Sequence, residues 1–327
     1  MTSADITNHK VCVAGATGHL GLSVVERLLA RNFSVVAVAR NAASPNIQLL
    51  RKLGAEVEFV DACKPEESYG KALSGAKTCI SCMASRVGPA GPSDFWAVDR
   101  DANIRLGLEA LESGIRHHIL VATFEGRESR NVSAFSAAKE EAVDTLRNEC
   151  RRMGAELTVI RPNAYFKDFT DMTLNRVHAK GEHLVIGDGS CRINPISKED
   201  VATFIVDCVE ANNLPGKDYL LGGPDVLTFM DIGILAAQVT GKENELKIRH
   251  VPVFCLRCIA SILDLLGFFS RWARHKGAIV HWMVFVSTHD AVAPCCGMHH
   301  LRDEFEQKFK TSTTRSNDKP HNTRPGS

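Results

Sequence analysis

Apolar positions in the first half of the chain follow two alternating patterns. Short runs rich in Val and Ile alternate with longer segments in which apolar residues recur every three or four positions. The short runs predict strands at residues 11–14, 34–39, 56–60, 78–82, 119–123 and 157–161. The longer segments predict helices at residues 22–31, 47–53, 102–113 and 134–153. This alternation is typical of βαβ units, so the sequence predicts an α/β fold with a doubly wound parallel Rossmann sheet.

The pattern changes after this predicted core. Loop and short helix patterns follow, with a sharp turn at residues 222–224, and the chain ends in a stretch rich in Ser, Thr, Asn, Pro and Lys. The polar ending predicts a disordered tail. The expected parts are an N-terminal segment at 1–10, a nucleotide-binding Rossmann core at 11–165, a smaller C-terminal substrate lobe interleaved with the core at 166–310, and the tail at 311–327.

A glycine-rich turn connects the first predicted strand to the first predicted helix. Gly15 permits an abrupt turn, Gly18 allows the backbone to approach a pyrophosphate, and Gly21 permits close packing of helix against strand. The helix N-terminus offers free N–H groups and a partial positive charge to phosphates. The expected dinucleotide contacts of this turn are Gly15, Thr17, Gly18, His19, Leu20 and Gly21. A chance glycine turn is the alternative, and the strand and helix that flank it favour binding.

The residue that follows the second predicted strand distinguishes NAD from NADP. An acidic residue there would bind the ribose 2′-hydroxyl, but the sequence has Ala39, Arg40 and Asn41. A guanidinium suits the 2′-phosphate, so Arg40 predicts NADPH as the cofactor, unless it is only a solvated strand end. Asp61, after the third predicted strand, is expected near the adenine.

Composition and charge exclude several classes of function. The 327 residues carry a formal net charge of +1, and no cluster of Lys and Arg indicates a surface for nucleic acid. Eleven scattered cysteines are typical of free thiols in a reducing compartment. The Cys79/Cys82 pair lies on a strand, where residues three apart point to opposite faces, so no metal site is expected.

Targeting and membrane signals are weak in this sequence. Residues 1–10 include Asp5, contain no apolar run and are too short for a transit peptide. We therefore expect a cytoplasmic protein, or a plastid protein if a leader has been removed. The apolar segment 251–269 is interrupted by Arg257 and Asp264, so no membrane span is expected. Its helix is expected in the core, or else as a lid over a flat hydrophobic ligand or a peripheral membrane contact.

Several short motifs resemble, in order and spacing, those of the atypical short-chain dehydrogenase/reductase superfamily, which includes NmrA-like NAD(P)-binding proteins. They are the glycine turn, Arg40, residues 81–86, Gly88, and residues 93–99, 135–139, 161–167, 194–197, 200 and 222–224. Within it, the chain is most similar to the divinyl (proto)chlorophyllide 8-vinyl reductases. The resemblance implies NADPH-dependent reduction of a vinyl group conjugated to a tetrapyrrole. It also implies cofactor contacts from Ala84, Ser85, Lys139 and Pro162.

The catalytic set of the superfamily is incomplete in this chain. The positions that match its Ser and Tyr hold Ala122, with Thr123 adjacent, and Phe135, while Lys139 is retained four residues later on the same helical face. The resemblance implies that Lys139 holds the nicotinamide ribose, although an ordinary surface lysine is the alternative. Tyr165 and Lys167, after the sixth predicted strand, are the expected proton source or substrate clamp.

Loss of the tyrosine disfavours ketone reduction and is compatible with hydride delivery to a conjugated C=C bond. The sequence therefore predicts an NADPH-dependent oxidoreductase acting on CH–CH groups, with a small-molecule substrate for which the resemblance implies a tetrapyrrole. Two alternatives remain: a redox sensor that binds NADP without turnover, and a structural subunit that retains the nucleotide.

Overall fold

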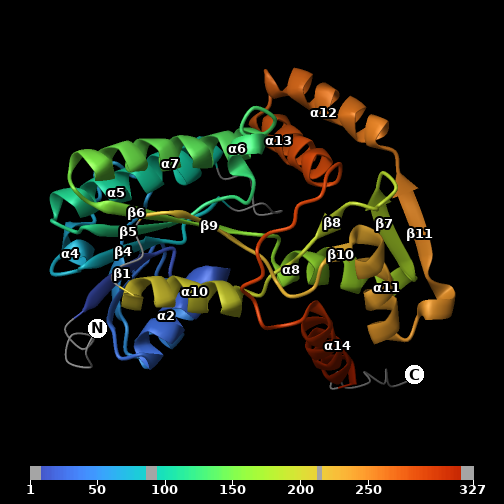
Figure 1. Ribbon diagram of the computed structural model, residues 1–327, viewed down its shortest axis with the longest axis horizontal. Helices are drawn as coiled ribbons and strands as arrows, with labels where there is room; N and C mark the ends of the chain where they lie inside the picture. The colour runs from blue at the N-terminus through green and yellow to red at the C-terminus, as the bar shows by residue number, and fades with distance from the viewer. Residues whose placement is uncertain (1–8, 86–93, 212–215, 318–327) are drawn as a thin grey trace, which may run out of the picture.

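The computed structural model (Figure 1) describes residues 9–85, 94–211 and 216–317. At its centre, seven strands form a sheet in the order β3-β2-β1-β4-β5-β6-β9. They are β1 (Lys10–Ala14), β2 (Ser34–Ala39), β3 (Glu56–Phe59), β4 (Thr78–Ser81), β5 (His117–Val121), β6 (Glu156–Pro162) and β9 (Asp218–Leu221). Every pairing is parallel, so the doubly wound Rossmann sheet and its six expected strands are confirmed.

Helices cover both faces of this sheet, which explains why its central strands are apolar on both sides. In Figure 1, α5 and α7 lie on one face, and α2 and α10 lie on the other. Val11, Val13 and Ile80 pack toward α2 and α10, whereas Cys12 and Cys79 pack toward α5. The helical segments are α2 (His19–Ala30), α3 (Asn46–Lys52) and α10 (Lys198–Ala211) on one face, and α4 (Gly70–Leu73), the π-helical segment η1 (Trp96–Ala102), α5 (Asn103–Glu112), α6 (Gly126–Ser129) and α7 (Ala134–Arg152) on the other.

The C-terminal half supplies two elements to the core. β9 extends the main sheet beyond β6, and α10 packs against α2. Arg27 donates to the Thr203 hydroxyl at 2.8 Å, and Arg31 donates to Asp207 at 2.6 Å, which ties the two helices together. Two segments distant in sequence therefore share one layer. The sequence did not predict β9, because a short strand at the sheet edge has no long apolar run.

The rest of the C-terminal half surrounds a separate apolar cluster. Phe166, Val177, Ile232 and Phe305 are among its buried members, so Phe166 is a core residue. A parallel pair, β7 with β11, and an antiparallel pair, β8 with β10, flank this cluster. The remaining elements are α8 (Phe166–Phe169), η2 (Thr170–Leu174), α9 (Asn175–Lys180), β7 (Glu182–Ile186), β8 (Arg192–Ile193), β10 (Leu227–Thr228), α11 (Phe229–Thr240), η3 (Glu243–Glu245), β11 (Lys247–Val251), α12 (Val253–Gly267), α13 (Arg271–Val286) and α14 (Leu301–Asn317).

The apolar segment at 251–269 is not a core helix. α12 packs against α13 and lies at the outer corner of the molecule in Figure 1. Only Ala260 and Gly267 of α12 are fully buried, whereas Phe254 and Leu265 are exposed. The prediction of a buried helix is therefore wrong, because none of the described elements forms a second layer over the outer face of α12.

The start of the expected tail also needs correction. We expected loss of order from Thr311, but α14 continues to Asn317. Glu304 with Lys308 and Glu306 with Lys310 form ion pairs one turn apart, which supports a helix of polar composition. Residues 318–327 and 1–8 lie outside the described residues, as do Arg86, Gly88 and Ser93 of the family motifs.

His118 on β5 predicts a stability loss in acid. The side chain is 2% exposed, neither ring nitrogen has a hydrogen-bond partner among the described residues, and burial lowers its pKa to about 4. Between pH 6.5 and 4 the unfolded chain therefore binds a proton that the folded protein does not. We expect this residue alone to lower the unfolding free energy by about 3 kcal/mol across that window.

Urea titrations at several pH values would measure this effect. His118→Phe should flatten the dependence on pH relative to the parent protein, because phenylalanine cannot bind the proton. His250, which is exposed, serves as the control through His250→Phe. An unchanged slope in His118→Phe would contradict the assignment of the acid sensitivity to His118.

Candidate functional site

The glycine turn lies where the order of strands reverses, between the carboxyl ends of β1 and β4. Gly15 has φ +75°, a conformation that favours glycine. A Cβ atom at Gly15 would lie 2.8 Å from the carbonyl carbon and oxygen of Cys82, and one at Gly21 would overlap the Gly15 carbonyl. Both positions therefore require glycine, and the expected connection of strand, tight turn and helix is confirmed.

The first turn of α2 points free N–H groups at this crevice. Gly18 is the N-terminal cap and has no side chain to satisfy them, while its own N–H donates to the Gly15 carbonyl at 2.9 Å. Asn46 donates to the carbonyl of Thr17 at 2.9 Å and fixes the turn from outside. Gly18 and His19 are exposed, and Leu20 is buried beneath them. This arrangement can bind an anion.

Arg40 and Asp61 follow β2 and β3 at the same edge of the sheet. Arg40 is exposed immediately after Ala39, the last residue of β2. The Asp61 carboxylate accepts a hydrogen bond from the backbone N–H of Cys63 at 3.1 Å, and Arg105 donates to the Asp61 carbonyl at 3.3 Å. Asp61 thus shapes the turn after β3, while the Arg40 guanidinium remains accessible to a ligand.

Lys139 is buried at the carboxyl ends of β4 and β5. Its ammonium group lies 3.2 Å from the carboxylate of Asp99 and donates to the carbonyls of Met83 at 2.8 Å and Val121 at 3.2 Å. Lys139 is 4% exposed and Asp99 0%. The alternative of an ordinary surface lysine is therefore wrong.

The segment after β4 shares this network. The backbone N–H of Ser85 donates to Asp99 at 3.1 Å, and Ala84 beside it is exposed. The hydroxyls of Ser85 and Thr123 are buried without a hydrogen-bond partner among the described residues. Both hydroxyls therefore have hydrogen-bonding capacity that the described residues do not use.

Asp99 is the functional candidate that the sequence analysis missed. It belongs to the motif at 93–99, but no role was assigned to it. The sequence nevertheless indicates that Asp99 lies on a buried helix face. Asp99 shares helical spacing with three apolar residues, Ala102, Leu106 and Ala110. All four are buried, so a carboxylate on this face must have an internal partner.

Phe135 occupies an aromatic cluster one turn before Lys139. Its ring lies 5.4 Å from that of Phe95 and 6.3 Å from that of Trp282 on α13. Phe135 therefore cannot donate a proton. Ala122, which follows β5, is buried and also lacks a hydroxyl. The site combines a buried cation with an apolar wall.

Tyr165 and Lys167 follow β6, whose last residue, Pro162, is buried and pairs with Leu221. Tyr165 is half-buried and contacts the His19 ring edge-on at 6.1 Å between centroids. Burial raises the pKa of the Tyr165 hydroxyl, so it stays protonated at neutral pH. Lys167 is exposed and forms an ion pair with Asp171, so it lies at the rim.

His19 is neutral at physiological pH. Desolvation lowers its pKa to about 4, and the positive charges of Lys198 and Lys167 add to the effect. A neutral imidazole next to the helix N-terminus can donate or accept one hydrogen bond without repelling another cation.

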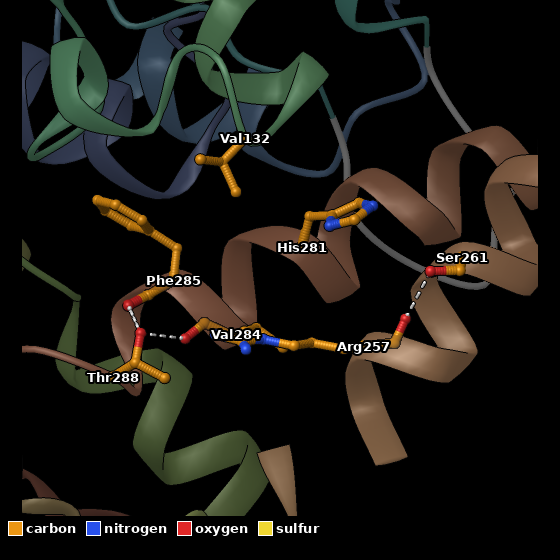
Figure 2. A pocket seen from close by; sticks show the side chains of 7 residues that line it. All are labelled: Val132, Arg257, Ser261, His281, Val284, Phe285 and Thr288. Atoms are coloured by element: carbon orange, nitrogen blue, oxygen red, sulfur yellow. Dashed lines mark hydrogen bonds between the residues drawn. The ribbon is translucent and has the colours of Figure 1, made fainter. Parts of the chain in front are cut away.

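A pocket of about 440 Å³ adjoins the start of α7, as Figure 2 shows. Val132 faces it from the loop before α7, and Val284 and Phe285 face it from α13. A second hollow of about 510 Å³ lies beside it and includes Ala134, the residue before Phe135. Both hollows combine apolar side chains with polar ones, and Val132 and His281 line both of them.

Among residues 9–85, 94–211 and 216–317, no three His, Cys, Asp or Glu side chains gather as metal ligands. Within the same ranges, no helix has the length and apolar composition needed to cross a bilayer.

Comparison with known proteins identifies relatives of this chain. Residues 15–212 match the family described as NAD(P)H-binding. The chain is similar to divinyl chlorophyllide a 8-vinyl-reductase, chloroplastic, from Arabidopsis thaliana, with 29% identity over 78% of this chain and 62% of the relative. The enzyme of the same name from Zea mays is 30% identical over 78% of this chain and 64% of the relative. The chain thus spans less than two thirds of the length of these curated relatives.

A solved structure has the same fold. Triphenylmethane reductase from Citrobacter sp., complexed with NADP(H), superposes with a TM-score of 0.68 at 19% identity, over 91% of this chain and 99% of the other. At this identity the similarity concerns the fold alone. It extends beyond the main sheet to most of the C-terminal half.

Proposed function

This chain belongs to the NAD(P)H-binding family, and we propose that it is an NADPH-dependent oxidoreductase that reduces a C=C bond conjugated to a tetrapyrrole ring. The observation that carries the proposal is the buried Lys139–Asp99 pair at the carboxyl ends of β4 and β5, beside a phenylalanine where the superfamily has its proton donor. The similarity to 8-vinyl reductases supports the choice of substrate.

The residues present fit a dinucleotide. Gly15 and Gly21 have no side chain, and a Cβ atom at either position would fill the space beside the backbone. The first turn of α2 offers free N–H groups for the pyrophosphate. Thr17, Gly18, His19 and Leu20 complete the proposed phosphate loop. Arg40 would bind the 2′-phosphate, and Asp61 would lie near the adenine. Ala84, Ser85 and Pro162 would line the nicotinamide half.

When bound, NADPH supplies a hydride to one carbon of the double bond. Lys139 would place a positive charge near the acceptor, where negative charge develops in the ring system. To bind the ribose hydroxyls, it would exchange its hydrogen bonds to the carbonyls of Met83 and Val121 for them. Tyr165, protonated at neutral pH, donates the proton to the second carbon, so hydride and proton together convert the vinyl group into an ethyl group. Lys167, at the rim, binds an acidic substituent of the substrate.

Isotope transfer tests this reaction directly. Purified protein is incubated with NADPH deuterated at C4 and a panel of divinyl tetrapyrroles. The proposal predicts one deuterium in an ethyl product, detected by mass spectrometry. Tight NADPH binding without transfer to any tetrapyrrole would contradict it.

That contrary outcome would favour the second candidate, an NADP-binding redox sensor without turnover. The specific observation in its favour is the replacement of both hydroxyl residues of the catalytic set, by Ala122 and Phe135. A sensor would bind NADPH and NADP⁺ with different affinities and change its exposed surface between the two states.

Arg40→Asp tests the choice of cofactor. A carboxylate would repel the 2′-phosphate and favour the 2′-hydroxyl, so we expect NADPH binding to weaken at least roughly tenfold and NADH binding to change little. Fluorescence titration with each nucleotide measures both affinities. Arg151→Asp, at an exposed position near the end of α7, is the matched control for the change of charge. Equal weakening of both nucleotides by Arg40→Asp would contradict the 2′-phosphate assignment.

A further inference from the structure

The outer face of α12 is apolar, and no segment that the structure describes covers it. Phe254, Ile262, Leu265 and Phe269 lie along one side of the helix and its end, and their exposed fractions are 74%, 58%, 64% and 92%. Helical spacing puts them in a single stripe. A surface helix normally turns its apolar stripe toward the core and its polar side chains to solvent, so this arrangement is reversed.

The polar side of α12 faces inward instead. Asp264 pairs with His281 of α13 at 2.7 Å, and Arg257 and Ser261 line the pocket in Figure 2. Gly267 of α12 and Gly277 of α13 allow the two helices to approach closely. The pocket therefore lies on the inner side of the hairpin formed by α12 and α13, and it leaves the apolar stripe free.

The turn of this hairpin is aromatic and has basic neighbours. Phe268, Phe269 and Trp272 are exposed by 79%, 92% and 56%. Arg271 and Arg274 lie in the first turn of α13. Arg271 contacts Asp94 at 3.2 Å, yet 82% of its side chain is exposed. Arg274 is also exposed and donates to the Gly267 carbonyl at 2.8 Å. The hairpin carries Arg257, Arg271, Arg274 and Lys276 against the single acid Asp264, in a chain whose net charge is only +1.

We infer that the α12–α13 hairpin binds the surface of a lipid bilayer that contains anionic headgroups. Phe268, Phe269 and Leu265 enter the outer acyl region, Trp272 lies at the headgroup level, and Arg271 and Arg274 contact lipid phosphates. A helix in the plane of the interface needs an apolar side toward lipid and basic residues beside it, and both are present here. The outer position of α12 in Figure 1 lets the hairpin reach a bilayer without contact from the Rossmann sheet.

Vesicle flotation with the full chain tests this assignment. Vesicles of phosphatidylcholine alone are compared with vesicles of equal parts phosphatidylcholine and phosphatidylglycerol. The double variant Phe268→Ser/Phe269→Ser should bind the anionic vesicles at least roughly tenfold more weakly than the parent protein. Met298→Ser is the matched control, since Met298 is 84% exposed and lies outside the hairpin, and it should leave binding unchanged. Added salt should weaken binding of the parent protein.

Other results would overturn the assignment. They are absence of binding to either vesicle type, or equal binding by the parent protein and the double variant. A second copy of the chain is the competing occupant of the stripe. Light scattering that shows self-association of the parent protein, lost in the double variant while vesicle binding is absent, would assign the stripe to a dimer interface instead. Circular dichroism confirms that the variants fold.

Discussion

Lys139→Met should lower the unfolding free energy by about 3–5 kcal/mol, because the substitution leaves the Asp99 carboxylate buried without its cation. The expected loss is this large because both side chains are almost fully enclosed, at 4% and 0% exposure. Among the described residues, the Asp99 carboxylate would retain only the hydrogen bond from the Ser85 backbone N–H, at 3.1 Å. Methionine has nearly the length of lysine, so the loss reflects charge and hydrogen bonding more than a cavity. Urea denaturation at neutral pH measures it.

The double variant Asp99→Asn/Lys139→Met is the control, since it removes both charges and keeps an oxygen that can accept from Ser85. It should recover most of the lost stability. The proposed catalytic role of Lys139 predicts that reductase activity nevertheless stays at least roughly a hundredfold below the parent in both variants, because neither would supply the cation next to the acceptor. Equal instability of the single and double variants would show that the ion pair is not the source of the loss. Activity restored together with stability would show that Lys139 has only a structural role.

The Rossmann sheet could be predicted because its physical cause is visible in the sequence. Parallel strands buried on both faces appear as continuous Val- and Ile-rich runs, and helices between them show their own spacing. The sequence did not predict β9, because this strand has only four residues and three of them are half-buried or exposed. The prediction for α12 was wrong for a different reason: periodicity shows that a helix has an apolar face, but it does not show what covers that face.

The candidate site was predictable where local chemistry determines it. The glycine turn follows from the backbone conformation that it requires, and Lys139 follows from its position in a family motif. Asp99 depends on a contact 40 residues along the chain, with a lysine on another helix, and only the fold brings the two together. The pocket in Figure 2 also combines distant segments, Val132 with α12 and α13, so its shape could not be derived from local pattern.

Gly15→Ala should both destabilise the protein and abolish nucleotide binding. At φ +75° an L side chain is strained by about 1–2 kcal/mol, and the new Cβ would lie 2.8 Å from the carbonyl group of Cys82. Relief of that contact requires β1 and β4 to separate at the point where the phosphates are proposed to bind. We expect a total loss of at least about 3 kcal/mol in unfolding free energy and at least a hundredfold weaker NADPH binding.

Gly75→Ala separates the contact from the backbone strain. Gly75 has φ +74°, almost the same as Gly15, but a Cβ there would meet nothing within 4 Å. This control should lose only about 1–2 kcal/mol and bind NADPH normally, because it carries the strain without the contact. Urea denaturation and fluorescence titration on both variants give the comparison. Equal destabilisation of the two alanine variants would contradict the effect assigned to the Cys82 contact. If Gly15→Ala bound NADPH with the affinity of the parent protein, the crevice between β1 and β4 would not be the nucleotide site.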